Sequence, residues 1–161
     1  MFEKFGEFDS VEELNMTAEG LKKEGDEDAL IELAVENGLD KGDAEDYLDG
    51  CMEELATPLT AALGKIKVEC EELKPKQIME DWVEYIKSQC MESDEMAAAV
   101  RRKGKSIKGC IAKLLKWSFG NQMAIENDIL KAAGVNAGRV TLGIPGMGQA
   151  KKIIRKYYMG K

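Results

Sequence analysis

Histidine is absent from this chain of 161 residues. Its absence excludes Ser-His and Cys-His nucleophilic systems, because those systems need an imidazole to take the proton of the attacking group. Carboxylates are plentiful, but 30 acidic side chains on helix surfaces form close pairs by chance and do not mark an acid–base site. We therefore expect a protein that is not an enzyme and that carries no cofactor.

Closely spaced cysteines are also missing. Cys51, Cys70, Cys90 and Cys110 stand 19 or 20 residues apart, and the chain has no CxxC motif. Structural zinc sites normally use close cysteine pairs, so we expect no metal site. Each cysteine falls on the apolar face of an expected helix, which predicts four buried thiols that act as small hydrophobic groups.

Long hydrophobic runs are missing too. No run of 18 apolar residues is present, so we expect no membrane-spanning helix and no membrane partner. The first ten residues, MFEKFGEFDS, lack the apolar core of a secretory signal, which predicts a cytoplasmic protein. A content of 44% hydrophobic and 33% charged residues predicts a folded chain with one domain or two small ones.

The formal net charge of −7 is distributed unevenly along the chain. Residues 1–100 contain 28 acidic and 9 basic side chains, a charge of −19, whereas residues 101–161 contain 2 acidic and 14 basic ones, a charge of +12. We therefore expect an acidic helical half, 1–92, and a basic helical half, 93–161, packed as one unit. Such asymmetry indicates interaction with charged polymers, or complementary surfaces that pack together or form a homodimer.

Capping signals and helical periodicity run through most of the chain. Ser10 before VEEL predicts a helix over 11–23. The four-residue spacing of Trp82, Ile86 and Cys90 marks the inner face of another helix. The predicted class is mainly α: a compact bundle of seven or eight short helices with a glycine-rich loop near the C-terminus.

Three segments carry weaker patterns. The three-residue spacing of Phe2, Phe5 and Phe8 favours a helical turn that docks on the core. The segment GDAEDYLDGCMEELA favours a helix over 42–56, and NQMAIENDILKAAG favours one over 121–134. These three interpretations rest on spacing alone, since no strong capping signal fixes both of their ends.

The glycine-rich loop covers GVNAGRVTLGIPGMG, residues 134–148. Its five glycines and Pro145 make an ordered helix unfavourable, and residues 140–142 favour a short extended piece. The spacing from Gly143 to Gly148 resembles a phosphate-binding loop, but Gln and Ala stand where that loop needs Lys and Ser or Thr. We therefore exclude a nucleotide site of that type.

The stretch Arg101–Trp117 contains seven basic residues and no acidic one. At about 100° per residue, four of its lysines fall within one arc of about 140°. Those lysines are Lys105, Lys108, Lys113 and Lys116. The opposite, apolar side is formed by Ile107, Cys110, Ile111, Leu114 and Leu115.

This basic stretch and a second one near the C-terminus, Lys151–Lys156, suit contacts with a nucleic-acid backbone. Nearby aromatic side chains, at positions 117, 119, 157 and 158, either stack on bases or belong to the core. The candidate nucleic-acid-binding residues are Arg101, Arg102, Lys105, Lys108, Lys113, Lys116, Lys151, Lys152 and Arg155.

The acidic half suits the opposite kind of contact. Rows of acids on rigid helices can imitate DNA phosphates and occupy a basic channel, or they can simply form a solvated surface. Their spacing does not match a calcium-binding EF-hand loop. The candidate protein-binding acids are Asp40, Asp43, Glu45, Asp46, Asp49 and Glu53.

Several stretches, among them ELATPLTAALGK, IMEDWVEYIKSQC, AVRRKGKSIKGCIAKLL and KKIIRKYYMGK, resemble a family found on mobile elements of gut Firmicutes. That family comprises PcfK-like proteins and anti-CRISPR inhibitors of the type II CRISPR effector nuclease. The resemblance covers most of the chain and rests on general sequence texture, so no functional residues are carried over from it.

The resemblance implies an anti-CRISPR protein in the cytoplasm of a bacterial host. Such a protein would bind the nuclease, alone or with its guide RNA, by stoichiometric contact, with DNA mimicry as one form of that contact, and would block DNA loading or cleavage. That nuclease holds nucleic acid in a positively charged channel, which suits an acidic partner. The alternative is a nucleic-acid-binding accessory protein of a conjugative or phage element, which would contact DNA or RNA through its basic half.

Overall fold

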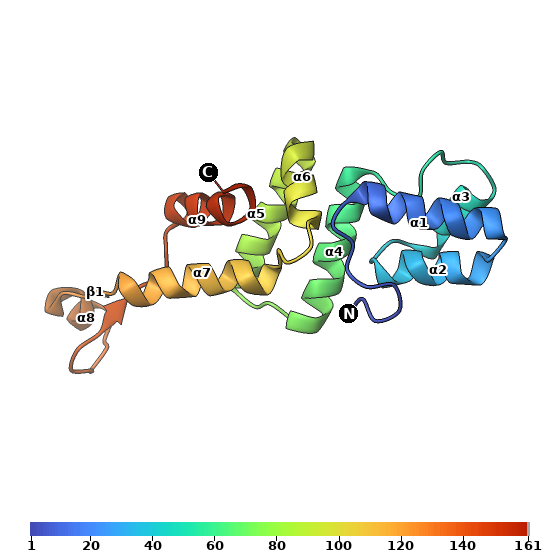
Figure 1. Cartoon of the computed structure of the whole chain (residues 1–161). Helices are drawn as coiled ribbons and strands as arrows, with labels where there is room; N and C mark the ends of the chain where they lie inside the picture. Colours follow the sequence, from blue (N-terminus) through green and yellow to red (C-terminus); the bar gives the residue numbers. More distant parts are fainter. Residues whose placement is uncertain (161) are drawn as a thin grey trace. The chain divides into compact units, whose positions relative to one another are not determined.

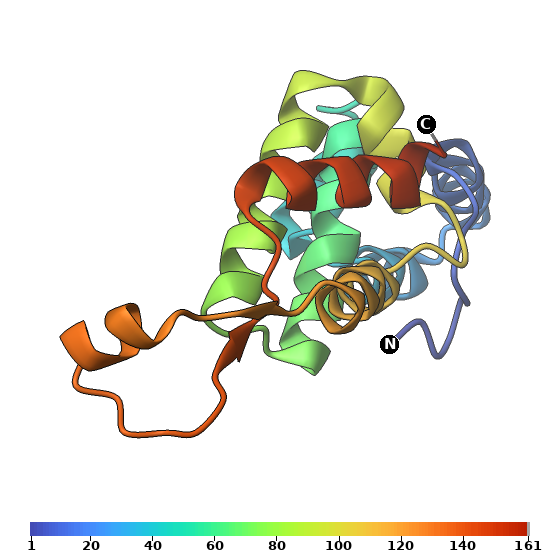
Figure 2. The same ribbon diagram turned by 90° about the vertical axis from the view of Figure 1, so that its left-hand side faces the viewer.

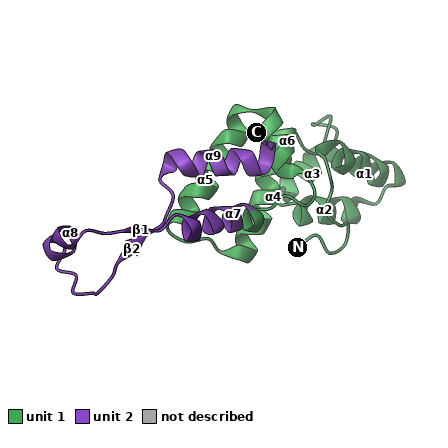
Figure 3. Cartoon of the chain, turned by 60° about the vertical axis from the view of Figure 1, so that its left-hand side comes forward, with its two compact units in different colours: residues 1–109 green, residues 110–161 purple. Residues whose placement is uncertain are grey.

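The structure, a computed structural model, describes residues 1–160. Its described residues form nine α-helices and one two-stranded ribbon, which confirms the mainly α class (Figure 1). Contacts between residues divide the chain into two compact units, unit 1 (residues 1–109) and unit 2 (residues 110–161) (Figure 3). This division falls after residue 109, whereas the boundary predicted from charge lies after residue 92.

Unit 1 contains six helices and the first residues of a seventh. These are α1 (Val11–Glu24), α2 (Glu27–Glu36), α3 (Lys41–Leu48), α4 (Pro58–Leu73), α5 (Ile78–Glu92), α6 (Asp94–Arg101) and the start of α7 (Ile107–Gly120). Unit 2 contains the remainder of α7 and then β1 (Met123–Ala124), α8 (Asn127–Ala132), β2 (Thr141–Leu142) and α9 (Met147–Met159).

Local capping fixes the ends of the strongest helices. Ser10 accepts a hydrogen bond from the Glu13 amide at the start of α1, as its sequence predicts. Thr57 and Thr60 form a reciprocal capping box at the start of α4. The predicted inner face of α5 is confirmed, because Trp82, Ile86 and Cys90 are all buried.

Two glycines allow the α2–α3 connection to lie directly on α4. Gly38 has a left-handed φ of 74°, and a methyl group added there would overlap the carbonyl oxygen of Gly64. A methyl group added at Gly64 would in turn overlap the carbonyl oxygen of Asn37. The two backbones therefore touch, and neither position has room for a side chain.

A buried lysine and a buried glutamate on α4 hold the connection between α6 and α7. Lys65 is 1% exposed, and its ammonium donates to the carbonyls of Arg102 at 2.8 Å and Lys105 at 2.6 Å. Glu69, one turn further along, accepts from the Ile107 amide at 2.6 Å. The first contact gives carbonyls that follow α6 a buried cationic donor, and the second satisfies an amide at the start of α7.

Arg101 is also buried, with 1% of its surface exposed, and it does not lie on the surface face where the sequence had placed it. Its Nη2 donates to the Asn37 amide oxygen at 3.0 Å. Its guanidinium lies over the rings of Phe2 and Phe8, at 5.7 Å and 5.9 Å from their centres. The prediction of Arg101 as a nucleic-acid contact is wrong, because a phosphate cannot reach this side chain.

The N-terminal segment, residues 1–10, is not helical, so the predicted turn through Phe2, Phe5 and Phe8 is wrong. Its backbone instead bonds to a side chain at the end of α2. The amides of Lys4 and Phe5 each donate to the Glu36 carboxylate at 3.0 Å. These two hydrogen bonds hold the non-helical segment on the last turn of α2.

Two further segments differ from the prediction. Helix α3 ends at Leu48, where the sequence favoured a helix to residue 56, since Gly50 turns the chain with a φ of 79°. Cys51 consequently lies exposed in a loop, whereas Cys90 and Cys110 are buried and their pKa values are raised to about 12 by burial. The segment 121–134 contains β1 before its short helix α8.

The burial of Glu69 leads to a prediction about pH. Burial raises its pKa above the ordinary value of 4.5, although Lys65 and the Ile107 amide act in the opposite direction. As pH rises past 4.5, the unfolded chain loses this proton before the folded protein does, which favours unfolding. Glu69→Gln removes that loss, so we expect the stability of the variant relative to the wild type to increase from about pH 4 to pH 7.

Urea titrations at several pH values measure this difference directly. Glu72→Gln, a change at an exposed glutamate of the same helix, is the matched control and is expected to shift stability by less than about 0.5 kcal/mol. A difference between Glu69→Gln and wild type that stays constant, or that falls as pH rises, would contradict the described burial.

Candidate functional site

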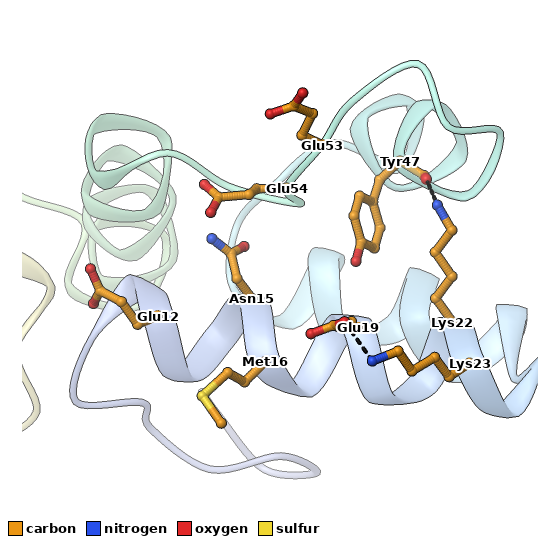
Figure 4. Close-up of a pocket in the computed structure, with 9 residues that line it drawn as sticks. All are labelled: Glu12, Asn15, Met16, Glu19, Lys22, Lys23, Tyr47, Glu53 and Glu54. Carbon is orange, nitrogen blue, oxygen red and sulfur yellow. Dashed lines mark hydrogen bonds and ion pairs between the residues drawn. The ribbon is translucent and has the colours of Figure 1, made fainter.

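An open groove of about 740 Å³ lies on unit 1, between α1 and the loop that joins α3 to α4 (Figure 4). The loop is fixed to α1 by Asn15, whose side-chain amide donates to the Ala56 carbonyl at 2.8 Å and accepts from the Ala56 amide at 3.0 Å. The lining residues are Glu12, Asn15, Met16, Glu19, Lys22, Lys23, Tyr47, Glu53 and Glu54.

The two lysines of the groove are already engaged. Lys23 forms an ion pair with Glu19 one turn away, and this contact lowers the pKa of the glutamate. Lys22 donates to the carbonyl of Tyr47 and lies 4.5 Å from the centre of its ring. Burial, followed by the nearby Glu19 carboxylate, raises the pKa of the Tyr47 phenol.

Three glutamates of the groove have no ion-pair partner within residues 1–160. Glu12 comes from α1, and Glu53 and Glu54 come from the facing loop (Figure 4). Exposed Met16, with 71% of its surface accessible, lies on the same face of α1. The arrangement suits a cationic side chain with an aliphatic stem, because carboxylates and an apolar contact are presented together.

Only one of the six acids proposed from the sequence lines this groove, and it is Glu53. Asp40 precedes α3 and pairs with Lys67 at 3.3 Å, and Glu45 pairs with Lys41 at 3.1 Å. Asp46 and Asp49 are exposed on or just after α3, and Asp43 is half-buried in its first turn. The structure therefore does not bring the six residues together as one site.

Glu12 and Glu19, on α1, were not selected from the sequence. Helical periodicity in the sequence could have grouped them, because the α1 residues that line the groove share one face of the helix. Those residues are 12, 15, 16, 19, 22 and 23. What the sequence did not reveal is the loop opposite them, because contacts between Asn15 and Ala56 join residues far apart in the chain.

The proposed basic residues, Arg101 aside, remain at the surface in two groups. Arg102 and Lys108 are exposed and Lys105 is half-buried in unit 1. In unit 2, the exposed members are Lys113, Lys116, Lys151, Lys152 and Arg155. Among the aromatic candidates Tyr158 is buried, Trp117 and Tyr157 are half-buried, and Phe119 is 76% exposed.

No protein-family model, curated protein or solved structure matches this chain. Within the part of the chain that the structure describes, no cluster of three metal-binding side chains is present. The same residues include no helix with the length and apolar character needed to cross a membrane. The fold and the groove thus describe a mainly helical protein with an open groove on unit 1 that is lined by four glutamates.

Proposed function

We propose that this protein is a stoichiometric inhibitor, an anti-CRISPR protein that binds a type II RNA-guided nuclease through the acidic groove of unit 1. The observation that carries the proposal is the set of unpaired glutamates, Glu12, Glu53 and Glu54, on a unit with 28 acidic and 14 basic residues. A positively charged nucleic-acid channel is the natural counterpart of such a surface.

Two features support binding without chemistry. The groove presents four carboxylates, an amide, a tyrosine and two lysines that are already engaged, a set that suits polar and ionic contacts. The resemblance to inhibitors from mobile elements points to the same class of partner. Within this proposal, Glu53 and Glu54 bind basic side chains that the nuclease uses for DNA, and the protein competes with the DNA for them.

A cleavage assay tests the proposal. Purified type II nuclease, guide RNA and labelled target DNA are combined with increasing amounts of the protein at about 0.1 M salt. We expect cleavage to fall to background as the protein approaches equimolar amounts with the nuclease. Cleavage that is unaffected at a tenfold excess of the protein would refute the proposal for that nuclease.

The order of addition identifies how the inhibition works. A competitor for the DNA channel blocks cleavage when it is added before the target, and it acts weakly when it is added after the target is bound. Raising the nuclease concentration tenfold at fixed protein and target distinguishes this from sequestration of DNA, because excess nuclease relieves only inhibition that depends on binding to the nuclease. Inhibition that depends on the ratio of protein to DNA, and not on the ratio to nuclease, would contradict binding to the nuclease.

A further inference from the structure

The exposed surface of unit 2 is rich in cations. Residues 110–161 contain nine basic residues and two acidic ones, Glu126 and Asp128. Asp128 lies 3.9 Å from Lys131 in the first turns of α8. The remaining cations belong mainly to α7 and α9, and neither helix contains an acid.

Helix α9 places its buried residues and its charged residues on different sides. Ala150, Ile154 and Tyr158 are buried, so its apolar positions are already used in packing. Besides Met147 at its first residue, and glycine, the exposed side chains of α9 are cations. Those cations are Lys151, Lys152, Arg155 and Lys156. A row of this kind matches a chain of phosphates, because each cation can replace a counterion of the backbone.

Helix α7 adds an aromatic ring to a second cationic row. Lys113 and Lys116 are exposed, as expected, but Leu115 is 54% exposed instead of lying inside with Leu114. Phe119 is 76% exposed and follows Lys116 by three residues, so the two side chains share one face of the helix. An exposed ring beside a lysine is the arrangement on which an unpaired base stacks while its phosphate is neutralised.

The end of α7 that carries this ring is held in place by the β ribbon. Gln122 donates to the Ser118 carbonyl at 2.8 Å and accepts from the Thr141 hydroxyl at 2.9 Å. A side chain at Gly143 would overlap Gln122 and the Ser118 carbonyl, so this backbone lies directly on the helix end. Helix α8 and its following loop extend outward from the ribbon (Figure 2).

We propose that unit 2 binds single-stranded nucleic acid, with phosphates on the cations of α7 and α9 and a base on Phe119. A lipid surface suits α9 less well, since its four exposed cations are accompanied by one exposed apolar side chain, Met147 at the first residue of the helix. This inference is independent of the proposed inhibitor function.

Fluorescence anisotropy with the full chain tests the inference. The probes are a labelled 20-nucleotide single strand of mixed sequence, as DNA and as RNA, and the matching duplex. We expect binding of the single strands at 50 mM salt that weakens as salt rises. With about six phosphates neutralised, the logarithm of affinity falls with the logarithm of salt with a slope of about −4.

Three variants locate the surface. Lys152→Glu with Arg155→Glu reverses two exposed cations of α9. We expect the variant to bind the single strands at least about tenfold more weakly, because each change removes about one phosphate contact. Phe119→Ala is expected to weaken single-strand binding by about fivefold or more while changing duplex binding less. The matched control, Lys41→Glu with Lys76→Glu, makes the same charge change at exposed positions of unit 1 and is expected to stay within about twofold.

Circular dichroism confirms that each variant is folded. The inference is overturned if the wild type does not bind the single strands at 50 mM salt, or if the α9 variant binds as tightly as the control. Tighter binding to vesicles of anionic lipid, or to polyglutamate, than to the oligonucleotides would also overturn it. The cleavage assay is run in parallel, and unchanged inhibition by the α9 variant separates this surface from the groove.

Discussion

Replacement of Lys65 by methionine is expected to lower the free energy of unfolding by about 3–5 kcal/mol, the range for breaking a buried ion pair from one side. The Lys65 ammonium pairs with the Glu7 carboxylate at 2.7 Å and also satisfies the carbonyls that follow α6. Methionine fills the volume but donates nothing. The variant therefore leaves Glu7 and those carbonyls without the donor that offsets their loss of water.

The effect has a matched control on the same helix. Lys67 is exposed and pairs with Asp40 at 3.3 Å, so Lys67→Met is expected to change stability by less than about 1 kcal/mol. Urea unfolding followed by circular dichroism gives both values under one set of conditions. Equal losses in the two variants would show that Lys65 is not a buried junction between the N-terminal segment, α4 and the α6–α7 connection.

Gly38→Ala is expected to lower the free energy of unfolding by about 3 kcal/mol or more. Overpacking against the Gly64 carbonyl costs about 1–3 kcal/mol. The left-handed backbone, with a φ of 74°, adds about 1–2 kcal/mol for a residue with a Cβ. Both costs therefore act at Gly38. The α2–α3 connection cannot relieve the overlap without losing its contact with α4.

Gly25→Ala separates the two costs. Gly25 has the same φ of 74°, but a methyl group added there meets no atom within 4 Å. This control is therefore expected to lose only the backbone part, about 1–2 kcal/mol. If Gly38→Ala were no more destabilising than Gly25→Ala, the two backbones would not be in contact as described.

The parts of the fold that could be predicted are those set by neighbours in the sequence. The Ser10 cap, the start of α4 at Pro58 and the inner face of α5 depend on residues within one or two turns. The burial of Lys65 and Arg101 depends on partners 30 or more residues away, such as Asn37 and the Lys105 carbonyl. A pattern of charges along the chain contains no information about such contacts.

The acidic groove was predictable only in part, for the same reason. The sequence identified the acidic half and selected Glu53, but it assigned residues 42–56 to a helix. In the structure that segment leaves its helix at Leu48 and returns to α1 through Asn15. The loop brings Glu53 and Glu54 opposite Glu12, and no spacing rule predicts where a loop returns.

The measurement that tests the central claim most directly is the affinity of the nuclease–guide RNA complex for two charge-reversed variants. Glu53→Lys with Glu54→Lys reverses two adjacent acids of the groove. Glu71→Lys with Glu72→Lys makes the same change at exposed positions near the end of α4. Both are compared with the wild type by titration calorimetry at 0.1 M salt, after circular dichroism confirms folding.

If the groove binds the nuclease, the first variant weakens binding at least tenfold, since it places like charges in contact at a cost of several kcal/mol. The second stays within about twofold of the wild type, because long-range attraction alone is screened. Equal loss of affinity in both variants, or full affinity in the groove variant, would contradict the claim that this acidic groove is the binding site.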